Sequence, residues 1–262
     1  MGIYCKQGGI LWVVLNLTKI VQKSAIGTFL INFYAINKFI DIFFKMRYNK
    51  IMKQKCKDIY NILYDIYKVP KCELEYGSLF QLLVAVILSA QCTDKRVNLV
   101  TKELFKKYKT CDDFLTLTKE QLEEKIHSCG FYHNKAKNIL KLCQELKDRY
   151  NGLVPSNMDD LLTLSGVGRK TANVVLSEGF KKNAIAVDTH VFRVSHRLGL
   201  SNSKTADKTE EDLKKLFDED MWSNLHLYLV LYGRYVCKSL RPKCVGCRLQ
   251  KYCNYYKEKI CS

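Results

Sequence analysis

Residues 164–176, LSGVGRKTANVVL, constrain the fold of this 262-residue chain more than any other stretch. Gly166 and Gly168 flank a single residue, which is typical of a turn that needs a positive φ or that something large approaches closely. Apolar residues then recur at helical spacing and predict a helix from residue 170 to about residue 179. The pattern therefore predicts a tight turn that leads directly into a helix.

Arg169 and Lys170 stand at this helix start, where free N–H groups and the helix dipole favour an anion over a cation. Two solvated cations are one interpretation, because they would cost only roughly a few tenths of a kcal/mol. In the other, the loop amides of Gly166 and Gly168 and the side chain of Arg169 bind a phosphate backbone. The surrounding positive charge would then favour the uncharged amine of Lys170. A neutral amine is a nucleophile that can form a Schiff base with a sugar carbon.

Asp188, in the segment AVDTHV, is the candidate partner of this amine. It precedes an apolar periodic run, so it is also a candidate helix N-cap. A helix over 170–179 is about 14 Å long at 1.5 Å per residue. The eight steps from Phe180 to Asp188 can span up to about 26 Å when extended. The chain can therefore return along the helix, and we expect Lys170 to face Asp188.

The motif pair LxGVGRKTANVVL and AVDTHVFR resembles the helix-hairpin-helix, Gly-Pro-Asp family of DNA glycosylases, specifically its endonuclease III branch. The resemblance implies that Lys170 and Asp188 are the catalytic residues. Ser165 stands where the family often has proline. This departure is expected to loosen the turn slightly and to leave the glycines, Arg169 and Lys170 in place.

The composition predicts a helical chain with a polyanionic partner. Only three prolines and thirteen glycines accompany long helical periodicities, which indicates an all-α protein. Lys and Arg number 43 against 26 Asp and Glu, a net charge of +17 that favours nucleic acid. The same periodicities predict helices over residues 51–67, 79–90, 96–108 with Asp94 as a cap, 112–114, 119–128, 134–150 and 158–164.

The resemblance covers about residues 51–260 and implies two helical domains. A six-helix, barrel-like domain with the helix-hairpin-helix would comprise residues 72–182. It would be inserted into a discontinuous iron–sulfur cluster domain made of residues 51–71 and 183–262. Duplex DNA with a damaged base or an abasic site would bind in the cleft between them. We expect a monomer that hands its product to downstream repair enzymes and has no membrane contact in its mature form.

Four cysteines form a second strong pattern, Cys237-x6-Cys244-x2-Cys247-x5-Cys253. The set suits a loop wrapped around a metal centre, and thiolates favour zinc or iron–sulfur. A four-cysteine zinc site usually has two CxxC pairs, whereas this set has one. The spacing resembles the cluster loop of endonuclease III, which implies a [4Fe-4S] cluster. The other eight cysteines are interpreted as free and mostly buried thiols.

Further DNA contacts are expected on three loops. Arg241 and Lys243, between the first two cysteines, are interpreted as phosphate contacts, with plain solvated charge as the alternative. Gln91 follows an apolar helix, and Phe131 stands in a turn before a basic helix. Their ordinary roles would be an exposed polar residue and a core aromatic. The resemblance implies instead that both loops push into the duplex and fill the space left by an extruded nucleotide.

The implied activity is that of a bifunctional DNA glycosylase and abasic-site lyase. It would remove oxidised pyrimidines from duplex DNA through a Schiff base on Lys170 and cleave 3′ to the abasic site by β-elimination. One alternative is an adenine-mismatch DNA glycosylase, although such relatives lack a lysine at position 170 and carry an additional C-terminal domain. The other is a non-catalytic DNA-binding module stabilised by zinc.

Residues 1–50 differ from the rest of the chain because they are apolar and basic, with Asp41 as the only acid. The segment 10–17 has the length of a signal-peptide apolar region, and 25–37 is too short to span a bilayer. We interpret residues 1–50 as a leader that directs the protein to an organelle containing DNA, a mitochondrion or a plastid. A nuclear protein with an ordinary N-terminus is the alternative.

Overall fold

The computed structural model describes residues 26–259, with side chains from residue 37 onward. Within these bounds the chain consists of helices and connecting loops without a strand, so the all-α prediction is confirmed. The chain divides into two compact units, of which the first ends at Gln54 and the second begins at Lys55. The apolar segment 10–17, on which part of the leader prediction depends, lies outside the described residues.

The first described helix, α2 (Ile26–Tyr67), begins 25 residues before the predicted start at residue 51 and ends at the predicted residue. Its extension has a simple cause, because no proline occurs before Pro70 and the added stretch offers few helix breakers. The predicted leader boundary at residue 50 therefore falls within a continuous helix. Among the described helices, none has the combination of length and apolar character that a membrane span requires.

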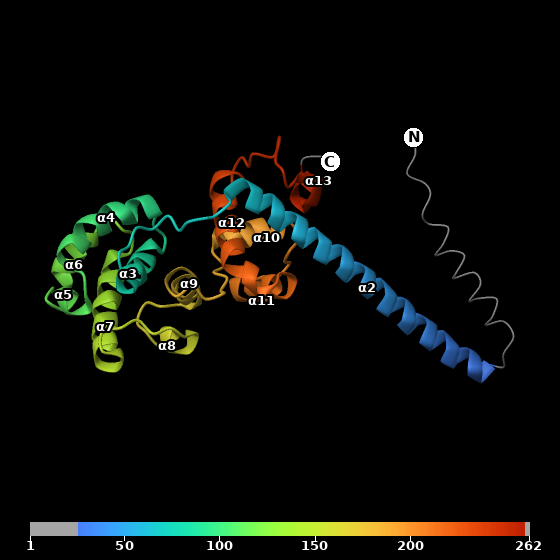
Figure 1. The fold of residues 1–262 in the computed structure, drawn as a ribbon, viewed down its shortest axis with the longest axis horizontal. Coiled ribbons are helices and arrows are strands. Elements are labelled where there is room, and N and C mark those ends of the chain that lie inside the picture. Colours follow the sequence, from blue (N-terminus) through green and yellow to red (C-terminus); the bar gives the residue numbers. More distant parts are fainter. Residues whose placement is uncertain (1–25, 260–262) are drawn as a thin grey trace. The chain divides into compact units, whose positions relative to one another are not determined.

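The next group of helices runs from residue 79 to residue 179 (Figure 1). It consists of α3 (Leu79–Ser89), α4 (Asp94–Lys107), α5 (Cys111–Leu115), α6 (Lys119–Ile126), α7 (Tyr132–Tyr150), α8 (Met158–Leu162) and α9 (Arg169–Val174), which continues as the π-helical turn η1 (Val175–Gly179). Each predicted helix of this stretch is present, with ends that differ by a few residues.

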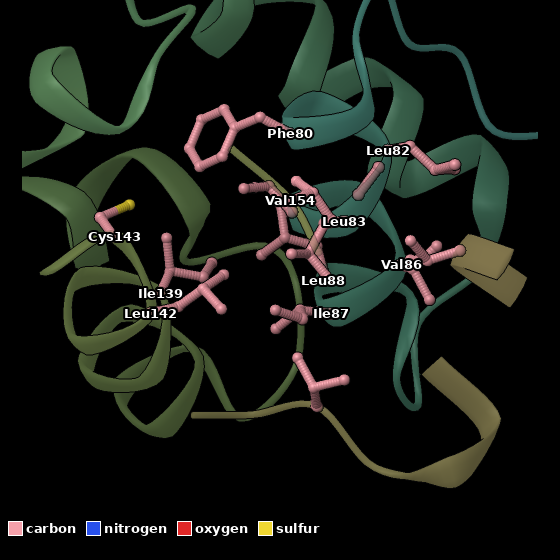
Figure 2. Close-up of a cluster of buried hydrophobic side chains, with 14 of the residues drawn as sticks. Phe80, Leu82, Leu83, Val86, Ile87, Leu88, Ile139, Leu142, Cys143 and Val154 are labelled. Atoms are coloured by element: carbon pink, nitrogen blue, oxygen red, sulfur yellow. The ribbon is translucent and has the colours of Figure 1, made fainter. Parts of the chain in front are cut away.

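Helix α3 is the centre of the core, as its nearly continuous apolar sequence predicts. Every residue from Leu82 to Leu88 is buried. Figure 2 shows its side chains beside Ile139, Leu142 and Cys143 of α7 and beside Val154. A helix that is apolar on all sides is stable in water only when other helices surround it, and α4, α7, α9 and η1 do so here.

Side-chain caps fix the starts of several helices. Thr93 caps α4 by accepting a hydrogen bond from the backbone N–H of Arg96. The predicted cap, Asp94, is instead the first helical residue, so that prediction was wrong by one position. Thr110 and Thr118 form capping boxes at the starts of α5 and α6. Such reciprocal caps satisfy N–H groups that a helix start leaves without partners.

The C-terminal group consists of α10 (Thr189–Arg197), α11 (Ala206–Leu216), the 3-10 turn η2 (Glu219–Met221), α12 (Trp222–Tyr235), the 3-10 turn η3 (Gln250–Tyr252) and α13 (Asn254–Lys259). The end of α2 packs against it, since the rings of Tyr60 and Tyr67 contact Tyr228 and the Tyr228 hydroxyl donates to the carbonyl of Lys68. The domain bounds at residues 72 and 182 stay a prediction.

Candidate active site

The turn between α8 and α9 has the expected glycine geometry at one of its two glycines. Gly166 has a φ of +80°, and a Cβ there would come within 3.0 Å of the Cβ of Asn138. Gly168 has an ordinary φ of −96°, and a Cβ on it would meet nothing within 4 Å. The positive φ thus belongs to Gly166, whereas Gly168 presents open backbone at the start of α9.

Ser165 holds this turn in place. Its backbone N–H and its hydroxyl both donate to the carboxylate of Glu145 on α7, at 2.7 and 2.8 Å. A proline could make neither bond, because it has no N–H and no hydroxyl. Ser165 therefore anchors the turn to α7, and a looser turn than with proline stays a prediction.

Arg169 pairs with a buried carboxylate. Its Nε and Nη2 donate to the two oxygens of Glu210 on α11, at 2.8 and 3.0 Å, and Asn173 and Lys214 donate to the same carboxylate. Burial alone would raise the pKa of Glu210, but these hydrogen bonds outweigh it and lower the pKa below its ordinary value. Arg169 thus ties α9 to α11 in this structure, and its contact with phosphate stays a prediction.

Lys170 and Asp188 lie in the wall of one cavity of about 600 Å³. Lys170 is exposed in the first turn of α9, and Val174 and Glu178 follow it along the same wall. His226 of α12 contributes to the wall from another helix. Both Lys170 and Asp188 belong to the described part of the chain, and they do not form an ion pair there. The structure therefore brings the two predicted catalytic side chains to one cavity with space between them.

Asp188 is the N-cap of α10. Its Oδ1 accepts hydrogen bonds from the backbone N–H groups of His190 and Val191, both at 2.8 Å. These two bonds fix the orientation of the carboxylate, and they leave Oδ2 as the oxygen that can act on a ligand. The predicted cap is confirmed, and capping and cavity lining are compatible in one residue.

His226 is a cavity residue that the sequence analysis missed. It is only 4% exposed, and its Nδ1 has no hydrogen-bond partner among the described residues. Burial lowers the pKa of His226 to about 4, against the opposing effect of Asp188 and with a smaller contribution from Lys170. The ring is therefore neutral near pH 7 and lies within electrostatic reach of both predicted catalytic side chains.

Gln91 and Phe131 lie on neighbouring loops. Both adopt the left-handed conformation, with φ of 53° and 59°, which is uncommon for residues other than glycine and costs on the order of 1 kcal/mol. Phe131 is 64% exposed, so the core alternative was wrong. Gln91 is exposed and also lines the cavity. Insertion of these side chains into DNA stays a prediction.

Lys135 connects the two loops. This side chain is only 6% exposed, and its ammonium donates to the carbonyls of Leu88 and Ala90 at 2.8 and 2.7 Å. The bonds join the start of α7, just after Phe131, to the end of α3, just before Gln91. The sequence analysis missed this residue, because a lysine in a basic helix gives no sign that it is buried.

Cys237, Cys244, Cys247 and Cys253 line one cavity near the C-terminus. Two of the sulfurs accept hydrogen bonds, Cys237 from Arg197 and Cys253 from the backbone N–H of Tyr256, and the Cys247 sulfur shares a hydrogen bond with the Tyr232 hydroxyl. Such donors stabilise thiolates. Among the described residues no three His, Cys, Asp or Glu side chains are arranged to hold a single metal ion. Four cysteine sulfurs that line one cavity form the donor set of a metal centre with four protein ligands.

Two arginines of α10 organise the cysteine loop. Arg193 donates to the carbonyls of Cys237 and Gly233, at 3.0 and 2.9 Å. Arg197 donates to the carbonyl of Lys238 at 2.8 Å and lies over the ring of Tyr255. The helix that begins at Asp188 therefore also supports the loop. In the sequence, the signal for this shared role was the four-residue spacing of Arg193 and Arg197, which places both on one face of a helix.

Arg241 and Lys243 are exposed on this loop. Arg241 has a φ of 50°, and the backbone N–H of Lys243 donates to the carbonyl of Val236, which fixes the loop at this point. The neighbouring Leu240 and Val245 are 83% and 95% exposed. The loop thus projects its side chains into solvent, and phosphate contact by the two cations stays a prediction.

Comparison with known proteins identifies the family. The model of the HhH-GPD superfamily of base excision DNA repair proteins matches residues 84–219, about half of the chain. Endonuclease III of Rickettsia prowazekii (strain Madrid E) is 50% identical over 187 residues, which cover 71% of this chain and 88% of the relative. The chain belongs to the endonuclease III family. Endonuclease III of Bacillus subtilis (strain 168) is 48% identical over 72% of this chain and 87% of its own length.

Solved structures agree with this family. A non-covalent complex of an endonuclease III with DNA superposes with a TM-score of 0.78 at 45% identity, over 80% of this chain and 99% of that one. A trapped covalent intermediate of an endonuclease III with DNA gives 0.76 at 47% identity, over 78% and 97%. As a member of the endonuclease III family, the chain is a base excision DNA glycosylase that binds DNA. The non-catalytic alternative is not supported.

Proposed function

We propose that this member of the endonuclease III family is a bifunctional glycosylase and abasic-site lyase for oxidised pyrimidines in duplex DNA. The single observation that carries the proposal is the presence of Lys170 and Asp188 in the wall of one cavity of about 600 Å³. This volume is within the range of cavities that enclose small ligands, about 300–1,000 Å³. A flipped-out nucleoside is such a ligand.

The first chemical step uses both side chains. The damaged nucleotide leaves the stack at lower cost than an intact one, because damage weakens its stacking and pairing. The amine of Lys170 attacks C1′ of the sugar, a C1′–N bond forms, and the bond to the base breaks, so that the base leaves with the electron pair and takes a proton from water. Oδ2 of Asp188 accepts a proton from the resulting ammonium and stabilises positive charge that develops on the sugar.

The second step breaks the strand. Ring opening converts the C1′ adduct into an imine with Lys170, which acidifies the proton on the neighbouring C2′. Loss of that proton expels the 3′ phosphate by β-elimination, and water then releases the lysine. One covalent intermediate thus serves base removal and strand cleavage. A lysine at position 170 favours this chemistry over that of an adenine-mismatch glycosylase.

A strand-cleavage assay tests the assignment. The wild-type protein should cut a duplex that contains thymine glycol and leave an unsaturated aldehyde at the 3′ end, the product of β-elimination. Lys170→Ala should abolish this product. Lys208→Ala, which removes another exposed lysine, should leave it unchanged. Cleavage by Lys170→Ala at the wild-type rate would exclude Lys170 as the nucleophile.

We also propose that the four cysteines hold a [4Fe-4S] cluster. The donor set of four thiols around one cavity and the hydrogen bonds to their sulfurs support this assignment. The cluster would supply four bonds that stabilise a loop with little core of its own. The purified protein should be brown with a broad visible absorption band, and Cys244→Ser should remove that band, whereas Cys56→Ser should not. A colourless protein with one zinc per chain would contradict the proposal.

The DNA contacts and the compartment belong to the same proposal. Gln91 and Phe131 would fill the space left by the flipped nucleotide. Their exposure and the hydrogen bonds of Lys135 that hold both loops support this role.

Residues 1–50 would direct the protein to a mitochondrion or a plastid. A fusion of residues 1–50 to a fluorescent protein should locate to one of these organelles, and diffuse fluorescence would contradict this part.

A further inference from the structure

Glu178 is a buried carboxyl in the wall of the active-site cavity. It is only 8% exposed, and it lies on η1, on the continuation of the helix that carries Lys170. Its nearest cation is Lys181, whose Nζ is 4.0 Å from a carboxyl oxygen and whose side chain is 76% exposed. Within the part of the chain that the structure describes, no hydrogen bond reaches this carboxyl. Glu178 is therefore buried almost without a protein partner.

A second buried glutamate, Glu210, has the opposite surroundings. Glu210 is 2% exposed and receives hydrogen bonds from Arg169, Asn173 and Lys214. It does not line the active-site cavity. A buried carboxyl without such donors costs stability. The fold provides donors for the glutamate that faces protein and, among the described residues, none for the one that faces the cavity.

The position of Glu178 fits a contact with the base of a bound nucleotide. Lys170, Val174 and Glu178 follow one another at four-residue intervals along one wall, so Glu178 lies about 12 Å beyond Lys170 at 1.5 Å per residue. The amine must reach the sugar. The base attached to that sugar occupies the remaining cavity, where Glu178 offers a polar group.

The chemistry of the carboxyl selects the part of the base that it can bind. Burial raises the pKa of Glu178 above its ordinary value, and Lys181 opposes this only in part. In the protonated form, which burial favours, a carboxyl has one O–H donor and one C=O acceptor side by side. A pyrimidine presents the matching pair on the edge that flipping exposes, an N–H or ring nitrogen next to a carbonyl or amino group.

We propose that Glu178 is a specificity-determining residue whose carboxyl forms paired hydrogen bonds with the Watson–Crick edge of the flipped pyrimidine. The inference rests on the proposed function, because it requires a damaged nucleotide in the cavity beside Lys170. It concerns the base alone. A substrate that has already lost its base offers nothing for this carboxyl to bind.

This difference between substrates provides the test. Base release from a thymine-glycol duplex and strand cleavage of a duplex with a preformed abasic site are measured with the same cluster-containing protein. Glu178→Leu should lower kcat/KM for base release by about 10- to 100-fold, the effect of lost buried hydrogen bonds, and change abasic-site cleavage by less than about twofold. Glu178→Gln should retain most base release, because the amide has one donor face and one acceptor. The exposed control Glu124→Leu should change neither reaction.

Two results would overturn the inference. One is an equal loss of both reactions in Glu178→Leu, which would indicate a general structural role. The other is unchanged base release. Failure of the proposed lyase function would give a different result, because the wild-type protein would then release the base but not cleave abasic DNA. In that case, base release by Glu178→Leu compared with the wild-type protein would still decide the role of Glu178.

Discussion

Arg169 and Lys170 are neighbours in the sequence, yet their side chains have contrasting surroundings. Arg169 is bound by Glu210 in a buried network with Asn173 and Lys214. Lys170 is exposed in a cavity wall and makes no ion pair with Asp188. The first cation holds two helices together, whereas the second is left available to a ligand. Donors surround the Glu210 carboxylate that Arg169 binds, whereas the Lys170 amine faces the cavity.

The largest effect is expected at Asp188. Asp188→Asn should lower the rate of base removal by about 100- to 10,000-fold, since an amide cannot accept the proton. DNA affinity and the free energy of unfolding should change little, because asparagine caps a helix as well as aspartate does. Single-turnover kinetics, DNA titration and urea denaturation measure the three quantities. A normal rate in this variant would mean that Asp188 acts as a cap only.

The next largest effect is expected on stability, at Arg169. Arg169→Met should lower the free energy of unfolding by about 2 kcal/mol, because the buried carboxylate of Glu210 loses two of its hydrogen bonds. Lys170→Met should change it by less than about 0.5 kcal/mol, as is usual for an exposed side chain. Urea denaturation gives both values. Equal destabilisation by the two variants would remove the distinction between these neighbours.

His226 should make the stability of the protein depend on pH. The folded state keeps this ring neutral, with a pKa of about 4 in place of the ordinary 6.5, so protonation favours the unfolded chain. Stability should therefore decline as the pH falls from about 6.5 towards 4, with a loss of about 2 kcal/mol by pH 5. His226→Leu should remove this part of the decline between pH 7.5 and pH 5. The exposed control His127→Leu should retain it.

The smallest effect is expected on the cysteine loop. Arg241 and Lys243 are exposed cations, and their joint replacement by alanine should weaken binding to duplexes of any sequence by about tenfold at moderate salt. The slope of log affinity against log salt should fall by about 2, because each lost phosphate contact contributes about 0.9. Binding titrations at several salt concentrations supply both numbers. An unchanged slope would show that neither cation contacts phosphate.

Local sequence patterns predicted much of this molecule. The glycine turn, the start of α9, the cap at Asp188 and the buried helix α3 all depend on residues within a few positions of one another. The cysteine spacing is local in the same sense. The proximity of Lys170 and Asp188 could be predicted because the connection between them is long enough to return along the helix. The structure places both residues in the wall of one cavity.

The interactions that the sequence analysis missed depend on long-range packing. Arg169 and Glu210 are 41 residues apart, and Lys135 reaches a carbonyl 47 residues away. Burial of Glu178 and His226 follows from which helices cover them, which neither helical periodicity nor motif spacing specifies. Charge alone suggested phosphate for Arg169, because its partner Glu210 lies 41 residues further along the chain.

The most direct test of the central claim is chemical trapping of the Lys170 adduct. The wild-type protein is incubated with a thymine-glycol duplex in borohydride, digested, and searched by mass spectrometry for the peptide that carries a reduced sugar. We predict one adduct, on Lys170, which is absent in Lys170→Ala and present in Lys208→Ala. An adduct on another residue, or trapping that persists in Lys170→Ala, would contradict the account.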